Sequence, residues 1–114
     1  MHEVRRHDDN ELCGGVESRT DGWHALAVFG ASLGVHPSRQ EAVRSVLTTG
    51  LASLMGRWTL TDCATGDEQV VCIQEASPHG VTLALDYYSL PDVPTMRLER
   101  SDLDRHRWSL RPCR

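Results

Sequence analysis

The chain has 114 residues, of which 39% are apolar and 25% are charged, and its formal net charge is −4. This length suits one domain of ordinary size, and the apolar content is too high for a disordered chain. No apolar stretch approaches the roughly 20 residues that cross a bilayer, and the first six residues are mostly polar, with no apolar run after them. We therefore expect no membrane span, no signal peptide and a cytoplasmic location.

The basic residues are all arginine, twelve in number, and the chain has no lysine. This bias is typical of a bacterial GC-rich genome, so arginine content alone does not indicate nucleic-acid binding. Its distribution is more informative, because residues 95–114 hold six arginines and three acidic residues, whereas residues 1–94 hold six arginines and thirteen acidic residues. The C-terminal fifth of the chain is therefore a basic segment, whereas the rest of the chain is acidic.

The first part of the chain predicts a loose start followed by a hairpin. Residues 1–13 have mixed charge and few apolar side chains, so we expect a disordered or frayed N-terminus and a single domain over residues 14–114. The pattern over residues 16–29 predicts a β-hairpin with its turn at Asp21-Gly22. Its second strand is apolar on both faces, which is typical of a central strand.

The strongest local pattern is a helix start at Ser38. Ser38 and Glu41 have the spacing of a capping box, in which each side chain bonds the other residue's backbone N–H. Apolar residues then recur three and four positions apart until Gly56, where a helix is expected to stop. This stripe predicts one long amphipathic helix over about residues 38–55 with one face packed on a sheet.

After Gly56 the apolar period changes to two, which predicts strands near residues 57–61, 70–73 and 81–87 in an antiparallel meander. The last segment, residues 95–114, fits two patterns. It can form two short strands (96–100 and 107–110) around a turn or short helix, or a helix capped by Ser101, and we favour the first.

These elements predict an α+β fold. We expect an antiparallel sheet of about five to six strands in the order β-β-α-β-β-β, with the long helix on one face and an extra C-terminal element.

Cysteine and histidine residues do not form a recognisable metal motif. The four cysteines, Cys13, Cys63, Cys72 and Cys113, lack the paired spacing of zinc ligands, and we expect free thiols, no metal and no cofactor. His24, His36 and His79 fall in a predicted strand, a helix entry and a turn. We therefore assign no catalytic residue.

A glycine-rich segment over residues 30–34 lies between a predicted strand and the helix, as a phosphate-binding loop does. It lacks the spacing and the lysine of that motif, which argues against nucleotide hydrolysis.

The basic segment is the best candidate for a binding site. Arginine forks bind carboxylates and phosphates, and an exposed tryptophan can stack on a base. The alternative is that nearby acidic residues simply pair with these arginines on a solvated face. The candidate binding residues are Arg97, Arg100, Arg105, Arg107, Trp108 and Arg111.

Residues 23–55 resemble the small partial ribonuclease-H-like fold of HicB-type antitoxins, through a strand, a loop and the helix start Ser38-x-x-Glu41-Ala42. The loop over residues 30–37 departs from the proline- and glycine-rich loop of that family. The resemblance implies a protein that binds a toxin and often DNA.

We expect a non-catalytic binding or regulatory module that contacts a protein partner as a homodimer, because apolar residues such as Leu26 and Val28 lie on the second face of the predicted sheet. One alternative is an accessory protein, antitoxin-like or not, that binds nucleic acid weakly through its arginine-rich C-terminus. Another is a small-ligand or enzyme domain with a pocket between helix and sheet, lined by His24, Cys72 or Tyr87.

Overall fold

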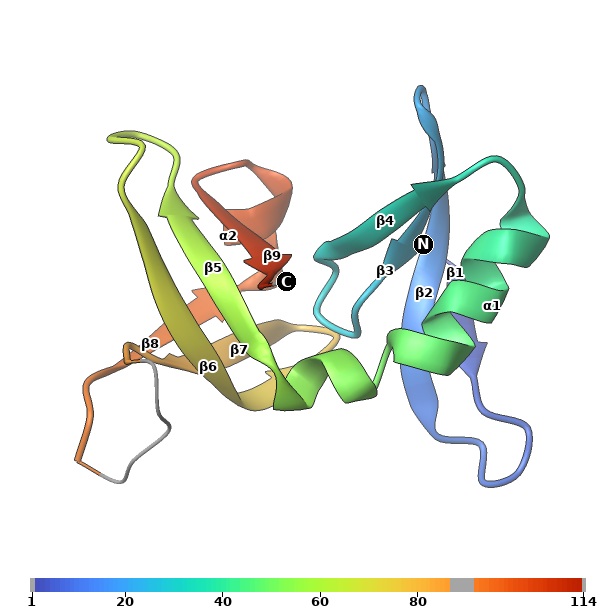
Figure 1. Ribbon diagram of the computed structural model, residues 1–114, viewed down its shortest axis with the longest axis horizontal. Helices are drawn as coiled ribbons and strands as arrows, with labels where there is room; N and C mark the ends of the chain where they lie inside the picture. Colours follow the sequence, from blue (N-terminus) through green and yellow to red (C-terminus); the bar gives the residue numbers. More distant parts are fainter. Residues whose placement is uncertain (1, 87–91, 114) are drawn as a thin grey trace.

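The computed structural model describes residues 2–86 and 92–113, and it is an α+β fold with two antiparallel sheets and one main helix (Figure 1). The first sheet has the strand order β1-β2-β3-β4, and its strands are β1 (His2–Arg5), β2 (Leu12–Arg19), β3 (Gly22–Leu26) and β4 (Ser32–His36). Helix α1 (Arg39–Thr49) packs on one face of this sheet. We call this part, residues 2–49, the first lobe.

The second sheet has the strand order β8-β7-β6-β5-β9. Its strands are β5 (Arg57–Asp62), β6 (Glu68–Ser77), β7 (Gly80–Ala84), β8 (Thr95–Glu99) and β9 (Trp108–Pro112). The short helix α2 (Arg100–Asp104) connects β8 to β9, which are the two edge strands. This second lobe, residues 57–112, follows a single 3-10 turn, η1 (Ala52–Met55).

The single sheet expected from the sequence is therefore wrong, and the strand order differs as well. Two strands were missed, β1 within the expected frayed start and β4 within the glycine-rich segment before the helix. β1 pairs with β2 and β4 pairs with β3, both antiparallel. The domain boundary expected at residue 13 stays a prediction.

Three of the predicted elements are confirmed. The hairpin β2–β3 is present, but it pairs Arg19 with Gly22, so its two turn residues are Thr20 and Asp21 and not the predicted Asp21 and Gly22. The meander is formed by β5, β6 and β7. The C-terminal segment is strand, short helix and strand, as favoured above.

Helix α1 begins at the predicted cap, since the Ser38 Oγ accepts a hydrogen bond from the Glu41 N–H at 3.2 Å. The reciprocal bond from the Ser38 N–H to the Glu41 carboxylate is absent among the described residues, so one half of the predicted capping box is confirmed. The helix ends at Thr49 rather than near residue 55. At Gly50 the chain lies against the backbone of β2, where a Cβ atom would overlap with the carbonyl oxygen of Cys13. The chain then continues through Gly50 and Leu51 into the separate 3-10 turn η1.

The first lobe has a small core between α1 and its sheet. Ala42 and Val46 of α1 are fully buried there. The other buried members of the cluster are Val4, Cys13, Val16 and Ala25. Leu47 and Met55 are exposed, although the apolar stripe predicts that they are buried, so the packed face of the helix is narrower than expected.

The larger core joins the two lobes. The loop between β3 and β4 leaves the first sheet and buries Ala27, Val28, Phe29 and Ala31 in the core of the second lobe. The remaining buried members of this cluster are Trp58, Leu60, Val71, Val81, Leu83, Leu98 and Leu110. Because Val28 and the neighbouring Leu26 are buried within the chain itself, they no longer support the expected homodimer, which stays a prediction.

Candidate functional site

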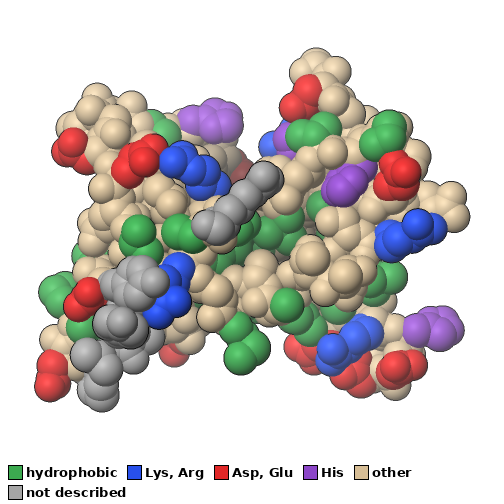
Figure 2. Space-filling view, in the orientation of Figure 1, with side chains coloured by type: hydrophobic (Ala, Val, Ile, Leu, Met, Phe, Trp, Pro, Cys, Tyr) green, Lys and Arg blue, Asp and Glu red, His purple; other side chains and the backbone are tan. Residues whose placement is uncertain are grey.

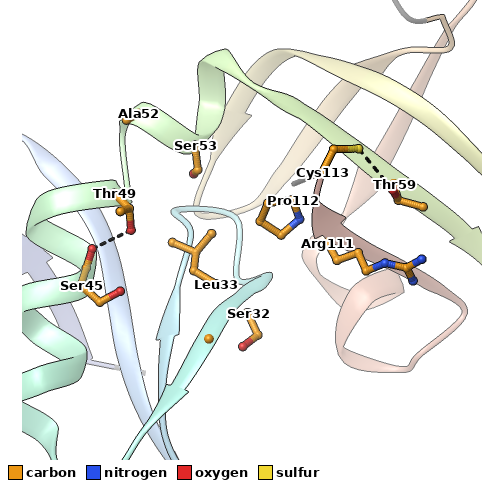
Figure 3. A pocket seen from close by; sticks show the side chains of 11 residues that line it. Ser32, Leu33, Ser45, Thr49, Ala52, Ser53, Thr59, Arg111, Pro112 and Cys113 are labelled. Carbon is orange, nitrogen blue, oxygen red and sulfur yellow. Dashed lines mark hydrogen bonds between the residues drawn. The ribbon is translucent and has the colours of Figure 1, made fainter.

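A cavity of about 1000 Å³ opens between the two lobes. Figure 2 shows the surface hollowed between the lobes, with hydrophobic side chains in the hollow. Leu33 of β4 and Pro112 of β9 approach each other across this cavity, and Ser53 of η1 lies above them in Figure 3. The remaining lining residues are Ser32, Gly34, Ser45, Thr49, Ala52, Thr59, Arg111 and Cys113. The cavity therefore lies between the lobes and not, as one alternative expected, between the helix and its sheet.

A second cavity, of about 350 Å³, lies beside the other end of β9. Its apolar wall comes from Leu103, Trp108 and Leu110, and its charged wall includes Arg19 of β2. The other lining residues are Glu17, Gly30, Ala31, Ser32, Asp104, His106 and Ser109. Ser32 lines both cavities, which places it between them.

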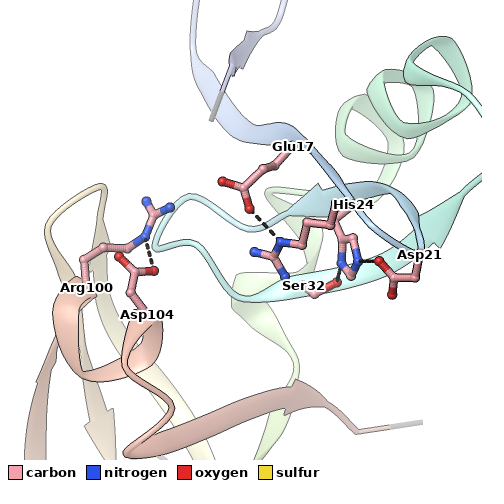
Figure 4. A network of polar contacts seen from close by, with 7 residues as sticks. Glu17, Asp21, His24, Ser32, Arg100 and Asp104 are labelled. Atoms are coloured by element: carbon pink, nitrogen blue, oxygen red, sulfur yellow. Dashed lines mark hydrogen bonds and ion pairs between the residues drawn. The ribbon is translucent and has the colours of Figure 1, made fainter.

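Ser32 belongs to a chain of three polar side chains in the first lobe (Figure 4). The His24 Nδ1 lies 2.8 Å from the Ser32 Oγ, and the His24 Nε2 lies 2.7 Å from an Asp21 carboxylate oxygen. His24 is buried, whereas Asp21 is exposed at the β2–β3 turn. The hydrogen bond from His24 lowers the pKa of Asp21 below its ordinary value. An ionised carboxylate only accepts hydrogen bonds, so whenever His24 is neutral its proton lies on Nε2 and its Nδ1 accepts a hydrogen bond from the Ser32 hydroxyl.

Charged side chains from both lobes meet near the smaller cavity. Glu17 accepts a hydrogen bond from the Arg19 Nε at 2.6 Å, and this contact lowers the pKa of Glu17, with a smaller contribution from the positive charge of Arg100. Arg100 in turn bonds Asp104 within α2 at 3.3 Å, and both face the β3–β4 loop in Figure 4. Gly30 of that loop has a φ of 95°, and a Cβ atom there would overlap with the Arg100 guanidinium.

Three arginines of the predicted binding site are held by acidic partners. Arg97 on β8 bonds Glu99 at 3.3 Å, and Arg111 on β9 bonds Glu68 at 2.9 Å. Arg100 bonds Asp104, as described above. Arg97 and Arg111 stand on opposite edge strands of the second sheet, so they do not form one patch with each other.

The other predicted site residues lie together after α2. Arg105 and Arg107 are exposed in the turn between α2 and β9, and neither makes an ion pair with another residue in the ranges 2–86 and 92–113. Trp108, the first residue of β9, is half-buried and lines the smaller cavity. His106 between the two arginines has a φ of 57°. The binding role of all six residues stays a prediction.

β9 is an edge strand that lies beside both cavities. Its residues 109 and 111 pair with Thr61 and Thr59 of β5, and the bond from the Cys113 N–H to the Arg57 carbonyl continues this pairing. In an antiparallel ladder, alternate residues bond the same neighbour, so Trp108 and Leu110 direct their backbone groups away from β5. Within the described part of the chain, no strand pairs with β9 on that side.

Sequence reasoning missed Asp21, His24 and Ser32 as a group. The three-residue spacing of Asp21 and His24 across a turn was the available signal. Ser32 approaches them only because β4 pairs antiparallel with β3. The glycines at positions 30 and 34 made β4 difficult to predict from the sequence.

The remaining candidates do not assemble into a site. Tyr87, one of the expected pocket residues, lies outside the described residues, and Cys72 is half-buried on β6, away from the lining of both cavities. No group of three or more histidine, cysteine or acidic side chains in the described ranges could hold a metal ion. None of the helices among these residues has the length and apolar character needed to span a membrane.

The chain matches no family model, no curated protein and no solved structure in comparisons with known proteins.

Proposed function

We propose that this chain is a binding module for an extended acidic segment of a partner protein, held along the outer edge of β9. The observation that carries the proposal is that β9 is an edge strand whose outer side, at Trp108 and Leu110, pairs with no strand in the described part of the chain. An edge strand with unpaired N–H and C=O groups is a template for a further strand, and many domains bind extended peptides in this way.

Specificity in this mode comes from side-chain pockets beside the edge strand. The two cavities lie one after the other along β9, since Trp108 and Leu110 line the smaller one and Arg111 and Pro112 line the larger one. Side chains of a bound segment alternate between faces, so some of them would meet Leu33 and Pro112 in the larger cavity.

Charge favours an acidic partner segment. Arg105 and Arg107 sit just before β9 without an acidic partner in the described ranges, and Arg19 is exposed in the smaller cavity. Arginine binds carboxylates through paired N–H donors, whereas the net charge of −4 on the whole chain opposes long-range attraction of nucleic acid. A protein segment is therefore favoured over DNA or RNA.

The test is selection from a random eight-residue peptide library displayed on phage, followed by affinity measurement of selected peptides. We expect selected sequences to be enriched in Asp and Glu at alternate positions. The double substitution Arg105→Ala/Arg107→Ala should weaken their binding about tenfold or more and reduce its salt dependence. Arg39→Ala/Arg44→Ala, on the exposed side of α1, is the matched control and should leave affinity unchanged.

The binding site is located by amide chemical shifts, which should change at Trp108 and Leu110 when a selected peptide is added. Selection of basic peptides, or shift changes confined to α1, would contradict the proposal. Micromolar binding of random duplex DNA at physiological salt would favour the nucleic-acid alternative if the same double substitution abolished it. In that case, the substitution should also lower the slope of log affinity against log salt by roughly one to two, because two phosphate contacts are lost.

The expected homodimer is tested separately by light scattering across micromolar concentrations. The exposed large apolar residues that a second copy could cover are, among those described, Val35, Leu47, Met55 and Val70. A monomer mass that does not change with concentration would contradict it.

A further inference from the structure

We infer that Ser32 is a nucleophile activated by His24 and Asp21, and that the smaller cavity takes a small carboxylic ester. This inference is independent of the proposed binding of a partner segment. It rests on the geometry of three side chains and on the position of the serine between two cavities.

The three side chains have the relationship that nucleophilic catalysis needs. A base must lie within hydrogen-bond reach of the nucleophile and must itself be oriented by a third group. The Ser32 Oγ lies 2.8 Å from the His24 Nδ1, and the Asp21 carboxylate lies 2.7 Å from the His24 Nε2. In the serine protease triad, the histidine Nε2 faces the serine and the Nδ1 faces the aspartate, whereas here the Nδ1 faces Ser32 and the Nε2 faces Asp21. In both arrangements the proton of the neutral ring lies on the nitrogen that faces the carboxylate.

Burial and strand pairing restrict the movement of these side chains. His24 is 8% exposed on a paired strand, so its ring cannot swing freely, and β3 and β4 fix the distance between His24 and Ser32. Asp21 holds the tautomer and would stabilise the imidazolium formed when His24 takes a proton. Ser32 is only half-buried and lines both cavities, so a ligand can reach its hydroxyl.

The smaller cavity indicates the class of ligand. Its volume of about 350 Å³ lies in the range of small-molecule sites. Leu103 and Trp108 give it an apolar wall for an acyl or alkyl group. Arg19 uses its Nε to bind Glu17, which leaves its two terminal nitrogens as donors for a developing oxyanion.

The reaction balances with water as the only co-reactant. The Ser32 Oγ bonds to the ester carbonyl carbon while its proton passes to the His24 Nδ1. The bond from that carbon to the alcohol oxygen then breaks, and the alcohol leaves with the proton from His24. Water attacks the resulting acyl-serine, gives a proton to His24, and releases the carboxylic acid as Ser32 regains its proton.

Diisopropyl fluorophosphate tests the nucleophile directly, because a reactive serine bonds to its phosphorus and fluoride leaves. We expect one adduct per chain, mapped to Ser32 by mass spectrometry, at a rate at least about 100-fold above that of the chain unfolded in urea. Ser32→Ala should abolish the adduct. Ser18→Ala, which changes an exposed serine outside the lining of both cavities, is the matched control and should leave the rate unchanged.

The variant Asp21→Asn tests whether Ser32 reacts because His24 and Asp21 activate it or only because its hydroxyl is accessible. Asp21 is on the surface, so the variant is expected to fold, and loss of the carboxylate removes the preference for the active tautomer. Labelling should slow at least about tenfold, and the burst of p-nitrophenol from p-nitrophenyl acetate should fall with it. Absence of an adduct, an adduct at another residue, or equal labelling of Asp21→Asn would overturn the inference.

Discussion

The ring centroids of Phe29 and Trp58 lie 5.3 Å apart in an edge-to-face contact. Phe29 comes from the β3–β4 loop of the first lobe and Trp58 from β5 of the second, and both are fully buried. Such aromatic contacts add to the free energy gained from burial alone. The Trp58 Nε1 also donates a hydrogen bond to the Ser53 carbonyl of η1 at 2.8 Å. One tryptophan therefore fixes both the inserted loop and the connection between the lobes.

Phe29→Ala is expected to lower the free energy of unfolding by about 3–5 kcal/mol, because it removes a fully buried ring and leaves a cavity in the shared core. Urea unfolding monitored by Trp fluorescence measures the change. Val35→Ala is the control, since Val35 is 47% exposed, and it should change the free energy by less than about 0.5 kcal/mol. A loss below about 1 kcal/mol for Phe29→Ala would mean that the loop does not depend on this ring.

Gly30→Ala should be more destabilising than Gly66→Ala. Both glycines have positive φ, 95° and 80°, so alanine costs about 1–2 kcal/mol at either position. Only Gly30 also faces the Arg100 side chain, whereas no atom lies within 4 Å of a Cβ at Gly66. Displacing Arg100 should add about 1 kcal/mol or more. Thermal and urea unfolding of the two variants measure the difference, and equal losses would argue against the contact between the loop and α2.

Local chemistry explains which elements the sequence predicts. The start of α1 depends on Ser38 and Glu41 alone, and the strands of the meander depend on alternation within each segment. Neither pattern specifies which strands share a sheet. Leu26 and Val28 suggest a second apolar face that needs a partner, whereas both are buried within the chain and Val28 lies in the core of the second lobe.

The candidate site was harder to predict than the fold. Arg97 pairs with Glu99 two positions along the same strand, a contact that the sequence allows, whereas the pairing of Arg111 with Glu68 depends on the registers of β5 with β6 and β9. The contact between His24 and Ser32 depends on the β3–β4 pairing, which a segment with glycines at positions 30 and 34 conceals. Long-range pairing of this kind has no local signature.

The four thiols are expected to react at different rates with a disulfide reagent such as Ellman's reagent. Cys63 and Cys113 are exposed and should react first, whereas Cys13 is 1% exposed and should react only as the first lobe opens. Cys113→Ser should remove one fast equivalent without changing the slow phase. When the chain is unfolded in denaturant without added reductant, the final absorbance should correspond to four thiols. A value below four thiols would indicate a disulfide.

The contact between Asp21 and His24 predicts a specific pH dependence of stability. The hydrogen bond from His24 holds the pKa of Asp21 below its ordinary value of 3.8, so the folded chain binds fewer protons than the unfolded chain in this range. Stability from this contact is therefore fully present above pH about 4 and is lost as the pH falls through the lower pKa of the folded state. Asp9, beside Arg6, and Glu17, beside Arg19, contribute with the same sign.

Comparing the unfolding free energies of the wild type and Asp21→Asn between pH about 2 and about 6 isolates the contribution of Asp21. The wild type should lose more stability than the variant as the solution is acidified, so the two curves converge at low pH. Asp8→Asn is the control, because Asp8 is exposed and makes no hydrogen bond within the described residues. Parallel curves for the wild type and Asp21→Asn would show that the carboxylate does not hold His24, and they would remove the basis for an activated Ser32.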